Sequence, residues 1–271
     1  MKTALLVSLV FLAKISLGQV TYTFNSEYIY KMTYNPDTSD RARVKEEYME
    51  LLVCDTASLF RSVKSGSADS VKQHHHREGI PMRPFREAPS LLSYTIIKKQ
   101  DKISYIDYQP EYNPNVIYYI EKPDDFMWEI QSATDTQLGF SCQSAQINYG
   151  GRTWTAWFTP DIPLMDGPYK FGYLPGLIVK LTSSDSLWDF SLVSNRSVKR
   201  EVSINKYPER KKEQLTRAGF HKSYNYFLEN KLLMDIAAGK ISFPTPEDRA
   251  AILSNYQYNV KRNSNRIELH P

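Results

Sequence analysis

Three consecutive imidazoles are the most direct sign of chemistry in this sequence, because histidine is a common ligand of transition metals. They are His74, His75 and His76. Consecutive side chains cannot all turn toward one ion, so a specific metal site needs partners from elsewhere in the chain. His221, Glu78 and Asp69 carry suitable groups. The flanking residues are polar and charged, and the alternative interpretation is a solvated surface loop that binds no metal.

A second pattern with chemical potential is a pair of carboxylates, Asp161 and Asp166, which flank the segment Ile-Pro-Leu-Met. Two carboxylates with different pKa values can divide general acid and base roles in a hydrolase. Turn formation is the simpler role for aspartate in such a segment. The sequence contains no HExxH, GxSxG, P-loop or GxGxxG motif. A Ser/His/Asp triad can nevertheless assemble from distant residues.

Aromatic side chains provide the third candidate site, for ligand binding, and they are Trp154, Trp157, Phe171 and Tyr173. Such residues can form the rim of an apolar ligand pocket. Trp154 and Trp157 are three positions apart, so in a regular strand they face opposite sides of the sheet and one of them belongs to the core. The alternative is that this region is a structural corner that locks the sheet.

The elements that must position these residues are mainly strands. From about residue 20 to residue 204, short runs rich in Tyr, Thr, Val and Ile alternate with turn residues. The expected strands cover residues 20–24, 26–34, 48–54, 93–97, 103–108, 116–120, 126–130, 137–149, 152–159, 177–182 and 188–194. Gly150-Gly151 predicts a hairpin. We expect a large antiparallel sheet, curved or half open, with a barrel-like meander.

Two segments interrupt this pattern. Residues 61–90 are rich in Ser, Lys, His, Arg and Pro, and are expected to form a polar excursion from the sheet. Residues 160–176 contain seven Pro and Gly residues but also several large apolar side chains. A flexible linker has little use for large apolar groups, so this second segment is expected to be a packed loop.

Residues 205–262 change to helical spacing. Apolar residues from about Pro208 to Ala238 recur at helical intervals, and Gly239 is a suitable stop. The cluster Arg210-Lys211-Lys212 is then expected on the solvated face of this first helix.

A second helix is expected to begin at Thr245-Pro246, which offers an N-cap and a proline at the first helical position, and to end near Val260. A short tail, residues 263–271, follows. The expected fold class is therefore α+β, mainly antiparallel β, with C-terminal helices packed on the sheet.

The first eighteen residues predict export. A basic start, an apolar run from Ala4 to Ala13 and small residues before Gln19 are typical of a signal peptide. The run is shorter than the roughly 20 residues that span a bilayer, so no membrane span is expected after cleavage. In this interpretation residues 19–271 form one domain, and the protein is periplasmic or secreted.

Charge and cysteine content limit the choice of partners. The chain has 34 Lys plus Arg and 30 Asp plus Glu, a net charge of +4 that falls to +2 without Lys2 and Lys14 of the predicted signal. This excess does not indicate a nucleic-acid partner. Cys54 and Cys142 could form a disulfide in an oxidising compartment or remain buried thiols.

Several ordered motifs lie between Gly150 and Ile178. They include Gly-Gly-Arg-Thr-Trp from Gly150, Gly-Pro-Tyr-Lys-Phe from Gly167, and Tyr-Leu-Pro-Gly-Leu-Ile from Tyr173. Together with Cys142 and the ending Asn265-Arg-Ile-Glu-Leu, they resemble the GLPGLI family of exported Bacteroidetes proteins. Tyr173 replaces the family's usual Gly, and Arg266 replaces a Pro.

The resemblance implies an exported, β-rich protein of uncharacterised role, and it brings no catalytic residues. We assign its motif a structural part, carried by Gly167, Pro168, Leu174, Pro175, Gly176, Leu177 and Ile178.

These observations favour an exported, non-catalytic binding or interaction protein. Its partner would be an apolar small molecule, a peptide or another envelope protein, and no cofactor can be assigned. The alternatives are an envelope hydrolase that uses Asp161 and Asp166, and a metal-handling protein that uses the three consecutive histidines.

Overall fold

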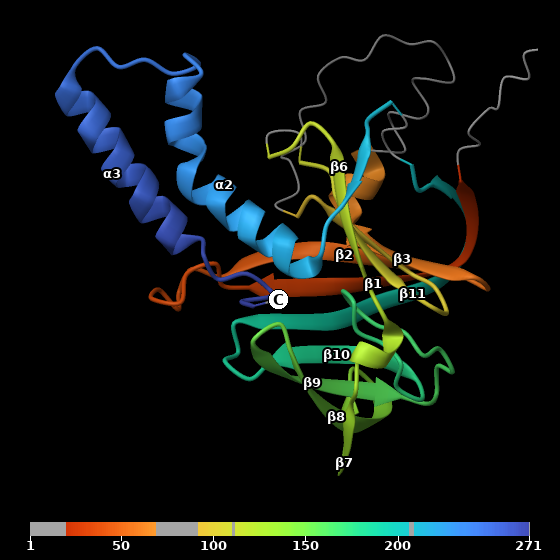
Figure 1. Cartoon of the computed structure of the whole chain (residues 1–271). Coiled ribbons are helices and arrows are strands. Elements are labelled where there is room, and N and C mark those ends of the chain that lie inside the picture. Colours follow the sequence, from red (N-terminus) through yellow and green to blue (C-terminus); the bar gives the residue numbers. More distant parts are fainter. Residues whose placement is uncertain (1–19, 69–91, 110–111, 206–208, 271) are drawn as a thin grey trace, which may run out of the picture.

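Strands of β-branched and aromatic residues dominate the computed structural model, which describes residues 20–68, 92–109, 112–205 and 209–270. Twelve strands of these residues form one sheet, in the order β12-β6-β5-β4-β3-β2-β1-β11-β10-β9-β8-β7 (Figure 1). Their bounds are β1 Thr21–Tyr34, β2 Lys45–Cys54, β3 Ala57–Ser62, β4 Tyr94–Lys98, β5 Ile103–Asp107, β6 Val116–Glu121, β7 Glu129–Gln137, β8 Phe140–Tyr149, β9 Arg152–Thr159, β10 Leu177–Ser183, β11 Trp188–Ser203 and β12 Lys212–Gln214.

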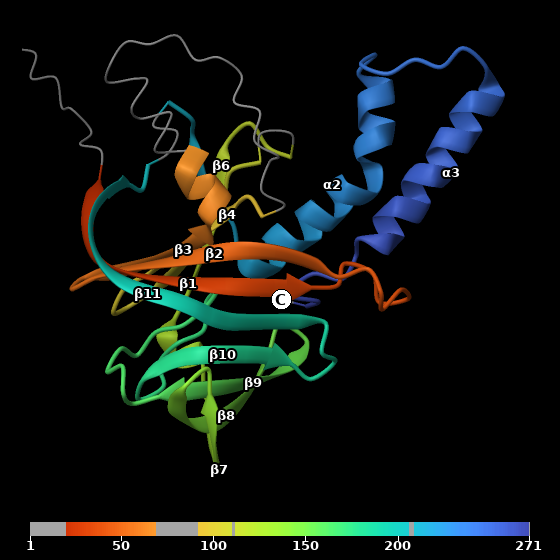
Figure 2. The same cartoon turned by 180° about the vertical axis from the view of Figure 1, so that it is seen from behind.

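The sheet consists of two antiparallel meanders. Strands β1 to β6 are neighbours in chain order, as are β7 to β11, and the long pair of β1 and β11 joins the two sets. Only β12 is parallel to its neighbour, β6. A 3₁₀ turn at Pro123–Asp125 lies on the connection from β6 to the far edge strand β7. The sheet is open and strongly curved (Figures 1 and 2).

Curvature places the main core on the inner face of the sheet, where both meanders contribute alternate residues. Tyr30, Phe60, Ile96, Trp154 and Phe190 are among its fully buried side chains. A smaller apolar cluster lies elsewhere, formed by Phe24, Leu52, Leu59 and Val202.

Two helices follow the sheet, α2 Arg217–Ala237 and α3 Pro246–Arg262. The hydroxyl groups of Thr216 and Thr245 cap them by accepting from the backbone N–H groups of Gly219 and Asp248. The first turns of α2 lie against the sheet, whereas the remainder of the pair projects away from it (Figures 1 and 2). Accordingly α2 buries Phe220, Phe227 and Leu232, and α3 buries no side chain.

The predicted α+β class, antiparallel sheet and C-terminal helices are confirmed. The first helix, however, begins at Arg217 and not near Pro208. Residues 212–214 instead extend the sheet as β12, and Arg210 donates to the backbone carbonyls of Asn113 and Asn115. The basic cluster therefore does not lie on a helix, because backbone pairing with β6 outweighs the helical spacing of the apolar residues.

Two further boundaries differ from expectation. The predicted strand over residues 137–149 is divided by a turn at Leu138-Gly139, where both residues have positive φ, at 55° and 85°. The expected polar excursion at residues 61–90 begins late, since strand β3 includes Arg61 and Ser62 and residues 63–68 are helical.

Among the described residues, no helix combines the length and the hydropathy needed to cross a bilayer.

A candidate binding site beneath the C-terminal helices

The Gly-Pro-Tyr-Lys-Phe motif places a lysine at the centre of a buried polar cluster. Lys170 has no exposed surface, and its Nζ lies 2.5 Å from Glu121 Oε2 and 2.6 Å from Glu268 Oε1. The hydroxyl oxygens of Tyr119 and Tyr149 are each 2.8 Å away. The three N–H donors of the ammonium group are therefore shared among four oxygens.

Glu268 connects this lysine to the helices. Its Oε2 lies 2.7 Å from Arg217 Nη2 and 3.2 Å from His221 Nε2, both on α2, and its Oε1 accepts from the hydroxyl group of Tyr169. Burial favours a raised pKa for this carboxyl group, but Lys170, His221 and Arg217 together outweigh burial and hold the pKa of Glu268 well below its ordinary value. We call these eight residues the motif network: Tyr119, Glu121, Tyr149, Tyr169, Lys170, Arg217, His221 and Glu268.

The C-terminal segment, residues 263–270, is held on the β8–β9 hairpin by a second group of contacts. The buried guanidinium group of Arg152 donates to Asn265 Oδ1 and, over 2.8 Å, to the Arg266 carbonyl. The Leu269 N–H donates to the Gly150 carbonyl over 2.7 Å. A Cβ on Gly150, where φ is +62°, would lie 2.8 Å from Glu268 Cγ. The Gly-Gly-Arg and Asn-Arg-Ile-Glu-Leu motifs are thus two sides of one contact.

The Pro/Gly loop is packed from Asp166 onward, as expected. Buried Lys98 donates from Nζ to the carbonyls of Gly167 (2.7 Å) and Phe171 (3.0 Å) and forms an ion pair with Asp166. Of the predicted motif residues, Gly167, Pro168, Leu174, Gly176, Leu177 and Ile178 are buried, and Pro175 is exposed. The Gly176 backbone has a φ of +148°, and a Cβ there would lie 2.1 Å from the Thr159 carbonyl oxygen. Only glycine fits this corner.

The two carboxylates of the proposed pair differ in burial. Asp166 is 8% exposed and is engaged by Lys98, and its Oδ1 accepts from the Gly167 N–H over 2.7 Å. Asp161 is exposed. Asp166 therefore helps to hold the loop in place.

The four aromatic candidates are divided between the core and its edges. Trp154 and Phe171 have no exposed surface, and their rings pack with centroids 5.1 Å apart. Trp157 is half-buried on the opposite face of β9, and Tyr173 is half-buried with a positive φ of 67°. Burial leaves Trp154 and Phe171 no open side on which to receive a ligand.

The cysteines do not form a disulfide in this structure. Cys54 lies on β2 and Cys142 on β8, five positions apart in the sheet order, and both are free thiols. Of the two possibilities that the sequence left open, a disulfide or free thiols, the structure contains the free thiols, on strands that lie in different meanders.

The three consecutive histidines, Glu78 and Asp69 lie outside the described residues. Within the described ranges no group of three or more His, Cys, Asp or Glu is placed to hold a metal ion. His221, which by residue type is a possible metal partner, is a member of the motif network.

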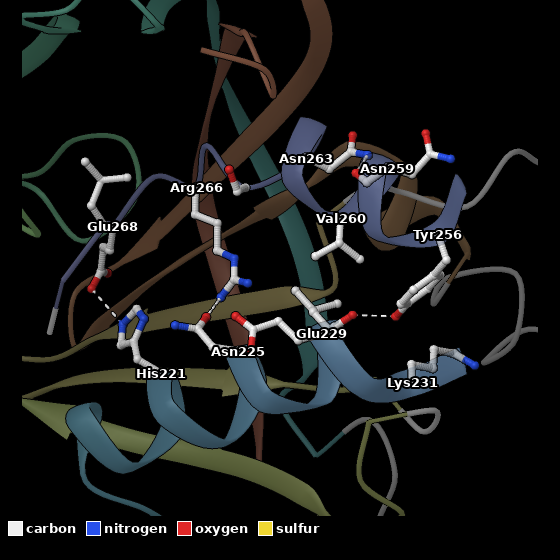
Figure 3. A pocket seen from close by; sticks show the side chains of 13 residues that line it. His221, Asn225, Glu229, Lys231, Tyr256, Asn259, Val260, Asn263, Arg266 and Glu268 are labelled. Atoms are coloured by element: carbon white, nitrogen blue, oxygen red, sulfur yellow. Dashed lines mark hydrogen bonds and ion pairs between the residues drawn. The ribbon is translucent and has the colours of Figure 1, made fainter. Parts of the chain in front are cut away.

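Two adjoining cavities lie beside the motif network. The interhelical cavity, about 420 Å³, is bounded by α2, α3 and the C-terminal segment (Figure 3). The aromatic cavity, about 310 Å³, lies between the inner face of the sheet, α2 and the same segment. Leu228, Asn263 and Arg266 line both. Figure 3 shows Arg266 extended toward Asn225 of α2, with His221 beside Glu268 further along the helix.

The aromatic cavity contains buried polar atoms without partners. Trp188 Nε1 and the Tyr94 hydroxyl group are both buried, and neither has a hydrogen-bond partner among the described residues. Both side chains line this cavity. Tyr34 stacks on Trp188 with ring centroids 4.8 Å apart, and Tyr105 lies 5.3 Å from Tyr94. The cavity is therefore lined by several aromatic side chains, two of which carry buried polar atoms without partners among the described residues.

Both signs of charge line this cavity. The Arg266 guanidinium lies 5.0 Å over the Tyr224 ring, and burial lowers its pKa from the ordinary value. Lys45 is a second cation in the wall. Asp107, opposite Tyr94 in the β4–β5 register, has its pKa raised to about 6 by burial, although the Gln109 N–H and the Ser93 hydroxyl group partly offset that effect.

Sequence reasoning did not find the aromatic cavity, because its lining comes from β1, β2, β4, β5, β11, α2 and the C-terminal segment. The one available signal is the ending Asn265-Arg-Ile-Glu-Leu, which supplies Asn265, Arg266 and Ile267 to the wall. Trp188 is not part of a recognisable motif. A cavity assembled from segments that are distant in sequence has no local residue pattern that could predict it.

Comparisons with known proteins agree with this fold and leave the role open. Residues 129–180 match the model of a Bacteroidetes-associated family described as a protein of unknown function (Porph_ging). A search of curated proteins found no match. A solved structure of PNGF-II in space group P21 is similar in fold, with a TM-score of 0.50 and 12% identity over 74% of this chain and 33% of that chain. For PNGF-II in space group C2 the values are 0.49, 13%, 74% and 32%. This chain therefore spans about a third of PNGF-II, and the likeness shows the fold alone.

Proposed function

We propose that this protein is an exported, non-catalytic binding protein whose ligand occupies the aromatic cavity. Export rests on the predicted signal at residues 1–18 and on the resemblance of the central motifs to the GLPGLI family. The matched family of unknown function is consistent with this assignment. The binding role rests on the geometry of the cavity.

The observation that carries the proposal is the pair of unpartnered groups, Trp188 Nε1 and the Tyr94 hydroxyl. Leaving a buried donor unpaired costs about 1–3 kcal/mol. The buried lysine nearby has four oxygen partners. These two groups, in contrast, are unpaired, and both belong to side chains that line one cavity. A ligand that accepts a hydrogen bond from each group would recover that cost, and this supports the cavity as a binding site.

The same wall defines the ligand's chemistry. The indole N–H is a donor only, so the ligand must present an acceptor there. Stacked rings favour a flat apolar body, and Arg266 and Lys45 favour a negative charge over a positive one. A volume of about 310 Å³ is at the lower end of the roughly 300–1,000 Å³ of ligand pockets. These features fit a small aromatic carboxylate.

Calorimetric titration with 2-naphthoate and with uncharged 2-naphthamide tests this assignment. We expect the carboxylate to bind more tightly than the amide. Trp188→Phe and Tyr94→Phe should each weaken binding of the carboxylate about tenfold, since each removes one hydrogen bond to a charged group. Trp157→Phe, on the outer side of β9, is the matched control and should bind as the wild type does.

Absence of binding by the wild-type protein would contradict the proposal. So would equal affinity in the wild type, W188F and Y94F, because binding would then take place elsewhere.

A further inference from the structure

A groove separate from both cavities lies over β4, β5 and β6. Its volume, about 700 Å³, exceeds that of either cavity beneath the helices. Its remaining walls come from the start of β1, from Ile204 and Asn205 after β11, and from Arg210 and Lys212. The joined ends of β1 and β11 bend away from the rest of the sheet (Figures 1 and 2). We call this hollow the outer groove.

Strand alternation makes the floor of the outer groove apolar. In β4 and β5, Tyr94, Ile96, Ile103 and Tyr105 belong to the inner core or pack against it. The alternate residues Ile97 and Ile106 therefore face the other side, where they line the groove with Val116 and Tyr118 of β6. Tyr22 and Ile204 add further apolar wall.

The charges of the outer groove have one sign. Its lining contains Lys99, Lys102, Arg210 and Lys212, and no Asp or Glu of the described chain lines it. Lys99 Nζ lies 5.3 Å from the centre of the Tyr22 ring. Arg210 is held by backbone carbonyls, including that of Pro114 at 2.6 Å. Four cations beside an apolar floor produce a positive potential in a place where water is partly excluded.

We propose that the outer groove binds a single-chain amphiphile with an anionic head, of the fatty-acid type. The apolar floor takes the hydrocarbon chain, and Lys99 and Lys102 take the carboxylate. A neutral apolar ligand would offer Lys99 and Lys102 no counter-charge, whereas a compact polar anion would leave the floor exposed. The groove lies on the other side of the sheet from the aromatic cavity, so this inference is independent of the proposed function.

Titration calorimetry with dodecanoate below its micelle concentration tests the inference, with dodecanol and dodecyltrimethylammonium as uncharged and cationic counterparts. Dodecanoate should bind, and the two counterparts should bind at least tenfold more weakly. A Lys99→Gln/Lys102→Gln double variant should lose at least tenfold in affinity for dodecanoate. Ile106→Asp, which places a charge on the floor, should lose as much.

Lys222→Gln, an exposed lysine on α2, is the control for charge, and W188F is the control for the aromatic cavity. Both should bind dodecanoate as the wild type does. Three results would overturn the inference: no binding of dodecanoate, equal affinity for all three amphiphiles, or unchanged affinity in K99Q/K102Q. Binding to anionic phospholipid vesicles without binding of monomeric dodecanoate would also overturn it, because the groove would then be a membrane-contact surface.

Discussion

The motif network and the aromatic cavity are neighbours beneath the same C-terminal segment, and both are rich in tyrosine, yet they treat buried polar groups in opposite ways. In the motif network, Lys170 has four oxygens within hydrogen-bond distance, and both oxygens of Glu268 accept. In the aromatic cavity, Tyr94 and Trp188 have no partner among the described residues. The first arrangement pairs its central buried charges, and the second leaves two buried polar atoms without partners among the described residues.

This difference suggests different parts for the two regions: the motif network stabilises the fold, and the aromatic cavity is the candidate ligand site. A fully paired buried cluster fixes one arrangement of the loop, the hairpin and the C-terminal segment. Removing one charged member leaves a buried charge without its partner, which destabilises the fold. An unpaired buried donor makes the folded state less stable by itself and gains a partner only when something binds. The most recognisable motif of the sequence therefore marks the stabilising cluster, and the candidate ligand site lies beside it.

The largest expected effect comes from the centre of the motif network. Lys170→Met should lower the free energy of unfolding by about 3–5 kcal/mol, because Glu121 and Glu268 lose the buried cation that they share. Urea denaturation of K170M beside Lys222→Met, an exposed lysine of α2, measures this difference. A loss below about 1 kcal/mol in K170M would mean that the network does not lock the fold.

The contribution of the motif network should also appear in the wild-type protein, as a loss of stability at low pH. The pKa of Glu268 in the folded state is lowered from 4.5, so its contribution to stability is present above about pH 4.5 and is lost as the pH falls below that value. Thermal unfolding from pH 3 to pH 7 should show this acid loss. Glu268→Gln should start from a lower melting temperature and show a flatter acid limb; an unchanged limb would assign the loss to other carboxylates.

The sequence predicts the local features of this structure better than the contacts between distant segments. Strand alternation, the Gly150-Gly151 hairpin and the Thr245-Pro246 cap are local signals, and the structure contains each of them. The network was only partly foreseeable. The motifs that contain Lys170 and Glu268 stand out in the sequence, but nothing local shows that side chains 98 positions apart would meet.

The aromatic cavity could not be predicted, because Tyr94 and Trp188 look like ordinary strand residues. Only the assembled sheet shows that their polar atoms lack partners. The same reason explains why the sequence left the state of the two cysteines open and why it misplaced the helix start. Both depend on which strands become neighbours, and short-range spacing does not specify this.

A smaller effect of opposite sign is expected at the wall of the aromatic cavity. Burial raises the pKa of Asp107 from 3.8 to about 6, so its contribution favours the folded state below about pH 4 and is lost as the pH rises through 6. Asp107→Asn should therefore stabilise the protein by about 1–2 kcal/mol at pH 7 and have little effect at pH 4. Chemical denaturation at the two pH values measures this; equal effects at both would show that the carboxylate ionises normally.

The smallest effect is expected for Tyr94→Phe, and a comparison with Tyr149→Phe separates the two regions most directly, because each variant removes one hydroxyl group. Tyr149→Phe should lose about 1–3 kcal/mol, since its hydroxyl group donates to Glu121 and accepts from Lys170. Tyr94→Phe should leave the free energy of unfolding unchanged or raise it by less than about 1 kcal/mol, since its hydroxyl group has no partner to lose. With saturating ligand, the wild type should have a higher free energy of unfolding than Y94F, because the wild type then gains a hydrogen bond that the variant cannot form. If Y94F is destabilised like Y149F without ligand, the Tyr94 hydroxyl group is already paired, and the aromatic cavity loses its claim to be the binding site.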